Sequence, residues 1–283
     1  MNRTSLKNKQ RIVVKIGSSS LTHPESKNID YRKLERLVRV LSDLRNQGKD
    51  VVLVTSGAQV VGRKVMSMVE DPSHLPQKQA LAAIGQAKLM MIYQRLFSEY
   101  NQNCAQVLLT KHNLMFKDGI QNAQNTFNAL LNMGVIPVVN ENDTVATDEI
   151  EFGDNDTLSA FVLALIHADL LIILSDIDGF YTDDPTTNPK ASLISEVEKI
   201  NDTHFKMGKD SSSSGVGTGG MNTKIKAAKI ATEAGADMVL ASGHDVFNIY
   251  RIVDGEPIGT CFSANPLPNF DLLNYIKGSD AHE

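Results

Sequence analysis

One unit occurs three times along the chain and constrains its fold more than any other feature. In each copy a helical pattern ends at a glycine, an apolar run follows, and a polar loop comes next. The glycines are Gly48, Gly134 and Gly235, and the runs are residues 50–55, 135–139 and 238–241. Glycine readily takes the left-handed conformation that ends a helix. Apolar runs without alternation are typical of strands buried on both faces. The pattern therefore predicts an α/β fold, a three-layer α/β/α sandwich with a mainly parallel central sheet.

Other segments extend the same pattern. Strands are predicted at residues 11–16, 105–109, 170–174 and 259–262, and helices at 31–46, 77–100, 120–133, 157–167 and 223–233. The most apolar stretch, residues 158–174, contains Ser159, His167 and Asp169. Because its character changes midway, it is predicted as a buried helix followed by a buried strand, and not as a membrane span.

Composition excludes some classes of protein. The chain has 283 residues, 42% of them hydrophobic, which suits one large domain or two closely packed lobes. A formal net charge of −5 argues against a protein that binds mainly nucleic acid. Cys104 and Cys261 are too few for a disulfide framework or a four-cysteine zinc site, and both lie in apolar runs. Since the first ten residues hold no apolar signal core, we expect reduced, buried thiols and a cytoplasmic location.

Ligands of such sheets bind at the carboxyl ends of the strands. The segments of interest therefore directly follow a predicted strand, at residues 17–20, 56–57, 140–143 and 175–178. Lys15 lies inside the first predicted strand, and it is either an edge or strand-end lysine that reaches water or a charge directed into the site. Residues 183–189 and 206–220 are the candidate hinges between lobes.

The glycine-rich segment at residues 214–224 is the sharpest local signal. Glycines allow backbone amides to surround an anion, and the following helix, with Lys224, adds positive potential. Gly215, Gly217 and Gly220 match G-x-G-x-x-G, but no strand directly precedes them, so the dinucleotide fingerprint is rejected. The sequence contains no G-x-x-x-x-G-K-[ST] P-loop. The alternative is a surface loop without a ligand.

A polar cluster lies between the strand at 135–139 and the helix at 157–167. It comprises Asn142, Asp143, Asp154, Asn155 and Asp156. Either Asp154 or Asp156 is expected to cap the helix. The remaining side chains exceed what capping needs, and they could orient an amine, organise lysines or ligate magnesium. Asp176 and Asp178 resemble the start of a calcium loop, but Thr187 stands where that loop needs glutamate.

Six motifs, in their order along the chain, resemble those of the amino acid kinase family. They are VVKIGSSS (13–20), VTSGA (54–58), VNENDTV (139–145), FGDND (152–156), LSDIDGFYTDDP (174–185) and GTGGMNTK (217–224). The resemblance runs from about residue 10 to about residue 262, and the combination is specific where each motif alone is not. Within the family, the set is most similar to enzymes that phosphorylate the γ-carboxylate of L-glutamate, the first step of proline biosynthesis.

The resemblance implies a single amino acid kinase domain over residues 1–283. About residues 1–168 would form an acceptor-binding lobe and about 169–262 an ATP-binding lobe, followed by a tail at 263–283. Many relatives continue into a C-terminal PUA domain, which is of an RNA-binding type. We expect no PUA domain in this chain.

The resemblance also implies roles for individual residues. Lys15 and Lys224 would stabilise the transferred phosphoryl group, and Asp156 would hold both lysines in place. L-glutamate would be bound by Ser56, Asp143 and Asn155. The ATP-binding residues would be Lys15, Ser175, Asp176, Thr218, Gly219, Gly220, Met221, Asn222, Thr223 and Lys224. Magnesium would be carried by ATP, and no protein ligand is named for it.

The resemblance further implies regulation and partners. Proline would act as a feedback inhibitor, because it resembles glutamate. Water destroys an acyl phosphate, so the acceptor loop would shield the product or the chain would pass it to glutamyl phosphate reductase. The helix at 77–100 is apolar on more than one face, and it is either buried on two sides or a dimer interface. We expect a homo-oligomer, with no nucleic acid and no membrane as partner.

Several alternatives stay open beside this interpretation. A relative that acts on N-acetylglutamate, aspartate, carbamate or UMP would share the phosphate site. An N-acetylated acceptor, however, has no ammonium for Asp143, and UMP needs a basic pocket. A non-catalytic amino acid sensor predicts loss of a phosphate lysine, yet Lys15, Asp156 and Lys224 are present. A dinucleotide-dependent oxidoreductase fails on the context of the glycines. The sequence contains neither H-x-x-x-H nor G-x-S-x-G, so a zinc enzyme or a serine hydrolase has no support.

Overall fold

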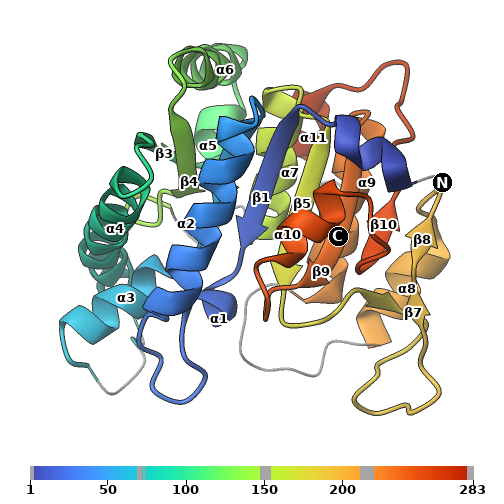
Figure 1. The fold of residues 1–283 in the computed structure, drawn as a ribbon, viewed down its shortest axis with the longest axis horizontal. Helices are drawn as coiled ribbons and strands as arrows, with labels where there is room; N and C mark the ends of the chain where they lie inside the picture. The colour runs from blue at the N-terminus through green and yellow to red at the C-terminus, as the bar shows by residue number, and fades with distance from the viewer. Residues whose placement is uncertain (1–2, 69–71, 73, 147–153, 211–219, 279–283) are drawn as a thin grey trace.

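A single large sheet organises the molecule. The computed structural model describes residues 3–68, 72, 74–146, 154–210 and 220–278. Within these residues eight strands form one sheet in the order β3-β4-β2-β1-β5-β9-β10-β8 (Figure 1). The strands are β1 (Arg11–Ile16), β2 (Asp50–Val54), β3 (Cys104–Leu109), β4 (Ile136–Glu141), β5 (Leu170–Ser175), β8 (Glu196–Val197), β9 (Asp237–Ser242) and β10 (Thr260–Phe262).

The sheet is mainly parallel, as the sequence predicts. Among the pairs of neighbouring strands in the described sheet, only β9 and β10 run antiparallel. A separate hairpin pairs β6 (Phe180–Tyr181) with β7 (Leu193–Ile194). The strand order changes direction between β1 and β5, which lie side by side in parallel register. Such a switch point is where ligands bind in open α/β sheets.

Helices cover both faces of the sheet and complete three layers. One face carries η1 (Arg3–Asn8), α2 (Tyr31–Asn46), α4 (Leu75–Ser98) and α10 (Asn248–Val253). The other carries α5 (Lys111–Leu114), α6 (Lys117–Asn132), α7 (Asn155–Leu165), α8 (Asp202–Asp210), α9 (Met221–Glu233) and α11 (Leu272–Gly278). The short helix α1 (Ser18–Leu21) follows β1, and α3 (Ala58–Val65) packs on α4 (Figure 1).

Alternation along β1 decides which way its lysine points. Ile12, Val14 and Ile16 lie in the core beneath α2 and α10, whereas Val13 lies in the core beneath α7 and α9. Because successive side chains of a strand point to opposite faces, Lys15 shares the face of Val13. The last polar position of this buried strand is thus directed toward α7 and α9.

The predicted elements all occur, and the differences lie at their ends. The predicted ranges for β1 and α2 match the structure, whereas α9 begins at Met221, two residues before the predicted start. Gly48, Gly134 and Gly235 each have positive φ, of 86°, 75° and 95°, just past the helices that they end. The sequence analysis did not predict α3, α10 or β8.

Two expectations need correction. The candidate hinge at 206–220 begins inside α8, so residues 206–210 are helical, while residues 211–219 lie outside the described part of the chain. Cys261 is buried as expected, but Cys104 is partly exposed, and neither forms a disulfide. Within the described residues, no helix combines the length and the apolar character that crossing a membrane would require.

Candidate active site

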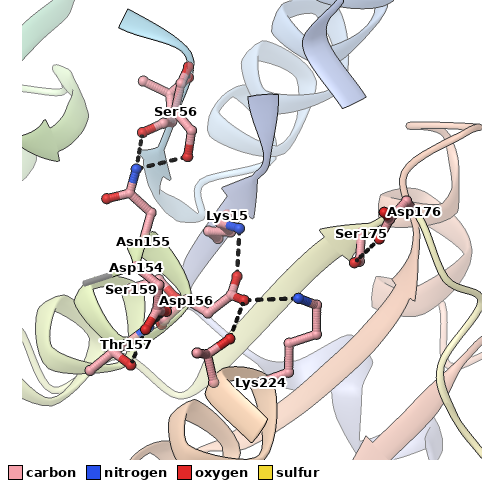
Figure 2. A network of polar contacts seen from close by, with 12 residues as sticks. Lys15, Ser56, Asp154, Asn155, Asp156, Thr157, Ser159, Ser175, Asp176 and Lys224 are labelled. Carbon is pink, nitrogen blue, oxygen red and sulfur yellow. Dashed lines mark hydrogen bonds and ion pairs between the residues drawn. The ribbon is translucent and has the colours of Figure 1, made fainter. Parts of the chain in front are cut away.

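The carboxylate of Asp156 joins two buried lysines from different parts of the chain. Its Oδ1 lies 2.5 Å from Nζ of Lys15 on β1, and its Oδ2 lies 3.1 Å from Nζ of Lys224 on α9 (Figure 2). Asp156 is fully buried, and the lysines are 8% and 6% exposed. The hydroxyl of Thr223 donates to the same Oδ2 at 3.2 Å. Lys15, Asp156 and Lys224, here called the lysine bridge, carry one more positive than negative charge.

The position of Lys15 in the sheet decides between the two interpretations of this residue. Its strand lies between β2 and β5 in the middle of the sheet, so Lys15 is not an edge lysine. The nearby charge of Asp156 compensates for the cost of taking its ammonium out of water. Lys15 is therefore a buried, paired charge at the switch point of the sheet.

The electrostatics of Asp156 follow from this arrangement. Burial disfavours the charged carboxylate and by itself would raise the pKa of Asp156. The attraction and hydrogen bonds of Lys15 and Lys224 outweigh burial, so the pKa lies below its ordinary value. The carboxylate stays ionised at neutral pH and can hold both ammonium groups.

Asp154 performs the capping role that the sequence left open between two residues. Its carboxylate accepts from the backbone N–H of Thr157 at 2.7 Å and from the Thr157 hydroxyl at 2.9 Å. Asp154 is thus the N-cap of α7. Burial and the negative charge of Asp156 raise its pKa. Because Asp154 caps the helix, Asp156 is left to hold the lysines.

Asn155 connects the start of α7 to the ends of β2 and β4. Its Nδ2 donates to the Ser56 hydroxyl at 2.7 Å, to the Asn140 side-chain oxygen at 2.9 Å and to the Thr55 carbonyl at 3.0 Å. Figure 2 shows the contact with Ser56 on one side of the lysine bridge. Neutral hydrogen-bonding groups thus gather beside the charged groups at the same edge of the sheet.

Ser175 and Asp176 lie on the other side of the lysine bridge, at the end of β5 (Figure 2). The Ser175 hydroxyl donates to the Asp176 carboxylate at 2.9 Å. Ser175 is buried and Asp176 is exposed. The Ser175 carbonyl accepts from the backbone N–H of Gly243, which follows β9. This pair therefore lies where the parallel strands β5 and β9 end together.

The remaining predicted residues lie around α9 and in the turn after β4. Gly220 is the exposed N-cap of α9, and Met221, Asn222 and Thr223 form its first turn. Thr218 and Gly219 lie outside the described residues. Asp143, predicted to bind the acceptor, lies partly buried in the turn two residues beyond β4.

Two contacts were not assigned by the sequence analysis. Asn140 lies within a segment that was singled out, but no role was given to its side chain, which is 2% exposed. Thr55 supplies a carbonyl that sequence cannot point to. The signal for Asn140 was available, because a polar residue at the buried end of an apolar strand requires a partner.

The arrangement favours a reaction at an anion. Two ammonium groups lie at the switch point, beside one cluster of neutral donors and acceptors and one helix N-terminus. Positive charge held in place without reorganisation stabilises charge that develops during phosphoryl transfer. Among the described residues, no group of three or more His, Cys, Asp or Glu side chains is arranged to hold a metal ion.

Known proteins resemble this chain in sequence over most of its length. The model of the amino acid kinase family matches residues 10–242. Glutamate 5-kinase of Carboxydothermus hydrogenoformans is 54% identical over 260 residues, which cover 92% of this chain and 69% of that protein. Glutamate 5-kinase of Clostridium acetobutylicum is 50% identical over 257 residues, which cover 91% of this chain and 96% of that protein.

Solved structures agree on the fold alone. Isopentenyl phosphate kinase of T. acidophilum superimposes with a TM-score of 0.61 at 18% identity, over 89% of this chain and all of that one. UMP kinase of Bacillus anthracis gives a TM-score of 0.61 at 13% identity, over 91% of this chain and 97% of that one. With the matched family model and the relatives of about 50% identity, these findings lead to one conclusion: the chain belongs to the amino acid kinase family.

Proposed function

We propose that the chain transfers the γ-phosphoryl group of ATP to the γ-carboxylate of L-glutamate. The product is L-glutamyl 5-phosphate, and the reaction is the first step of proline biosynthesis. The observation that carries the proposal is the lysine bridge at the switch point of the sheet. Relatives of about 50% identity that bear the name glutamate 5-kinase support the choice of acceptor.

The reaction asks this chain for positive charge and positioning. A carboxylate oxygen of glutamate attacks the γ-phosphorus, a new oxygen–phosphorus bond forms, and the bond to the β-phosphate oxygen breaks to release ADP. The acceptor is already ionised, so no general base is needed. Two anions must approach each other, and Lys15 and Lys224 offset their repulsion and stabilise the transferred group. Asp156 acts through the lysines by holding both ammonium groups in place.

The acceptor would lie beside Ser56 and Asn155. The Ser56 hydroxyl can donate to a carboxylate, and the Asn155 side-chain oxygen can accept from the α-ammonium group. Asp143 would supply a negative charge for the same ammonium. In this proposal the acceptor-binding lobe comprises about residues 1–168.

The nucleotide would lie on the other side of the lysine bridge, over a lobe formed by about residues 169–262. Ser175 and Asp176 would lie beside it, and residues 218–224 would surround its phosphates. The N-terminus of α9, with Lys224, suits a phosphate because backbone N–H groups and a positive charge meet there. Magnesium bound to ATP would neutralise part of the phosphate charge.

Further properties belong to the same proposal. Proline would inhibit by competing for the acceptor site, and the chain would form homo-oligomers in the cytoplasm. The acyl phosphate product hydrolyses readily, so glutamyl phosphate reductase is the expected consumer. None of these properties changes the chemistry of the lysine bridge.

The test offers four acceptors separately to the purified chain with ATP, magnesium and hydroxylamine. They are L-glutamate, N-acetyl-L-glutamate, L-aspartate and UMP. ADP release is followed for all four, and hydroxamate formation for the three amino acid acceptors. We expect ADP and hydroxamate with L-glutamate alone, and suppression of both by added L-proline.

Other results would change the proposal in defined ways. Turnover with another acceptor would retain the phosphate site and reject L-glutamate. No turnover with any acceptor would favour a sensor that binds amino acids without catalysis. Turnover with L-glutamate that proline leaves unchanged would retain the reaction and reject the feedback site.

A further inference from the structure

Gln86, on the long helix α4, makes a buried contact with the acceptor side of the site. Its side chain is 6% exposed, and its Oε1 accepts a hydrogen bond from Nδ2 of Asn140 at 3.0 Å. Asn140, at 2% exposed, in turn accepts from Asn155. The chain of contacts thus runs from α4 across the end of β4 to the start of α7.

Each hydrogen bond in this series has one direction, and the side-chain oxygen of Gln86 is the final acceptor. Because Gln86 presents an oxygen, Asn140 must present its NH₂ group to Gln86 and its oxygen to Asn155. Asn155 must then direct its NH₂ group toward Asn140, Ser56 and Thr55. The Thr55 carbonyl, which can only accept, and the Gln86 oxygen therefore hold the two ends of this series of hydrogen bonds in one direction.

These orientations decide what an acceptor meets. The Ser56 oxygen accepts from Asn155, so the Ser56 hydroxyl hydrogen is available to donate to a carboxylate. Both Asn155 amide hydrogens are engaged, which leaves its side-chain oxygen to accept from an ammonium group. If the Asn140 amide flipped, its NH₂ group would face the NH₂ group of Asn155, because the Thr55 carbonyl keeps that group of Asn155 in place.

The nitrogen of the Gln86 amide, Nε2, indicates that this residue does more than fill space. Its Nε2 is buried and has no hydrogen-bond partner among the residues that the structure describes. A buried, unsatisfied amide donor destabilises a fold, and a methionine at this position would remove that donor but leave the buried NH₂ group of Asn140 without its acceptor. The demand of Asn140 for a facing acceptor therefore favours glutamine over an apolar side chain here.

We propose that Gln86 is a positioning residue that, together with the Thr55 carbonyl, holds the hydrogen-bond direction of Asn140 and Asn155 and thereby supports the preference for an amino acid acceptor. The proposal rests on the proposed function, because it assigns the ammonium and carboxylate of the acceptor to Asn155 and Ser56. Gln86 itself touches neither substrate nor the transferred group.

The experiment compares two substitutions of Gln86 that differ in one property. Gln86→Met keeps the length of the side chain but removes the acceptor, whereas Gln86→Glu retains an oxygen facing Asn140. Gln94→Met is the matched control, because Gln94 is exposed on the same helix. For each variant we measure kcat, the KM for L-glutamate and the KM for ATP, together with the melting temperature.

For Gln86→Met we expect the KM for L-glutamate to rise about tenfold, which corresponds to the loss of one oriented hydrogen bond. The KM for ATP and kcat should change by less than about twofold, because the lysine bridge is not touched. Gln86→Glu and Gln94→Met should both keep the KM for L-glutamate near that of the wild type.

An unchanged KM for L-glutamate in Gln86→Met would overturn the inference. Equal rises in Gln86→Met and Gln86→Glu would also overturn it, because they would indicate packing in place of direction. A wild-type chain that turns over a different acceptor rejects the proposed function instead. The same three constants, measured for that acceptor, then decide the role of Gln86.

Discussion

The two sides of the site use different physical means. On the side proposed to bind phosphate the groups are charged, with Lys15 and Lys224 held by one buried carboxylate. On the side proposed to bind the acceptor, the contacts that the structure places at Asn155 and Asn140 are neutral and directional. The attraction of an ammonium group for an anion depends little on the orientation of the group, so such charges suit stabilisation of a transferred phosphoryl group. Amide orientation distinguishes a donor from an acceptor, so it suits recognition.

Three consecutive residues at the start of α7 serve both sides. Asp154 caps the helix, Asn155 faces the acceptor side, and Asp156 holds the lysines. Because α7 is buried along its length, its first turn is held in place by the core. The first turn of one buried helix therefore holds a hydrogen-bonding amide, Asn155, and a charged carboxylate, Asp156, at a fixed separation.

Removing a charge from the phosphate side should have the largest effect. We expect Lys224→Met to lower kcat with L-glutamate by about 10³-fold, because a preorganised positive charge is lost at the transferred group. ADP release measures the rate, and circular dichroism checks the fold. Lys229→Met is the matched control, because Lys229 is exposed on the same helix. Activity near wild type in Lys224→Met would remove Lys224 from the phosphate site.

Removing the shared carboxylate should damage both activity and stability. In Asp156→Asn two buried ammonium groups lose their partner, so we expect a loss of about 3 kcal/mol in the free energy of unfolding. The KM for ATP and kcat should change more than the KM for L-glutamate. Urea unfolding and steady-state kinetics measure these effects. Asp118→Asn is the matched control, because Asp118 is an exposed acid in the first turn of α6.

Acid titration tests whether Asp156 is ionised and paired with the two lysines in the folded protein. Its pKa is lower in the folded protein, so the unfolded chain takes up the proton first as the pH falls. The stabilisation is therefore full above the ordinary carboxyl pKa of about 3.9 and is lost as the pH falls through the lower folded value. Asp156→Asn should lack this part of the acid dependence, and an identical pH profile of stability would contradict the assignment.

A change in packing should affect the acceptor side more selectively. At Gly85, next to Gln86, an added Cβ would lie 1.7 Å from the Ala58 carbonyl oxygen of α3. Helix propensity alone favours alanine by about 1 kcal/mol, but the clash reverses the sign. For Gly85→Ala we expect about 2 kcal/mol lower stability and a higher KM for L-glutamate, with the KM for ATP little changed.

Gly278→Ala at the end of α11 provides the contrast for Gly85→Ala. An added Cβ there meets no atom of the described part of the chain within 4 Å. Thermal unfolding should show little change for this variant. Equal stability of both alanine variants would mean that α3 and α4 separate without cost, and the selective effect on glutamate would then lose its basis.

The smallest expected effect is at the cap of α7. Asp154→Ala removes the acceptor for Thr157, and we expect the free energy of unfolding to fall by about 1 kcal/mol. Asp154→Ser should restore most of this loss, since serine is also a good N-cap. Urea unfolding compares the two. A loss of kcat as large as that of Lys224→Met would show that Asp154 does more than hold the helix.

Local patterns predicted the elements well because their causes are local. Gly48, Gly134 and Gly235 end helices through a conformation that glycine takes without strain, whatever lies around them. The apolar runs were recognised as buried strands for the same reason. The short helix α3 and strand β8 were missed, because packing supports them more than periodicity.

The candidate site was predicted only in part. The family motifs pointed to Lys15, Asp156 and Lys224, and the structure brings them together. Capping by Asp154 rather than Asp156 could not be chosen from sequence, because both are good N-cap residues. Gln86 gave no signal, since one glutamine in a long helix resembles any surface residue until its burial is known.

The amino-acid sequence by itself determined the class of fold, the order of the elements and the motifs of the family. These depend on spacing, turn residues and apolar runs, which act over a few residues. The tertiary structure alone decided that Lys15 is central, that one carboxylate holds two lysines and that Gln86 of α4 reaches Asn140. Those facts depend on the order β1-β5-β9 and on which helix lies beneath each strand. Contacts between residues far apart in the chain form only when the whole core packs.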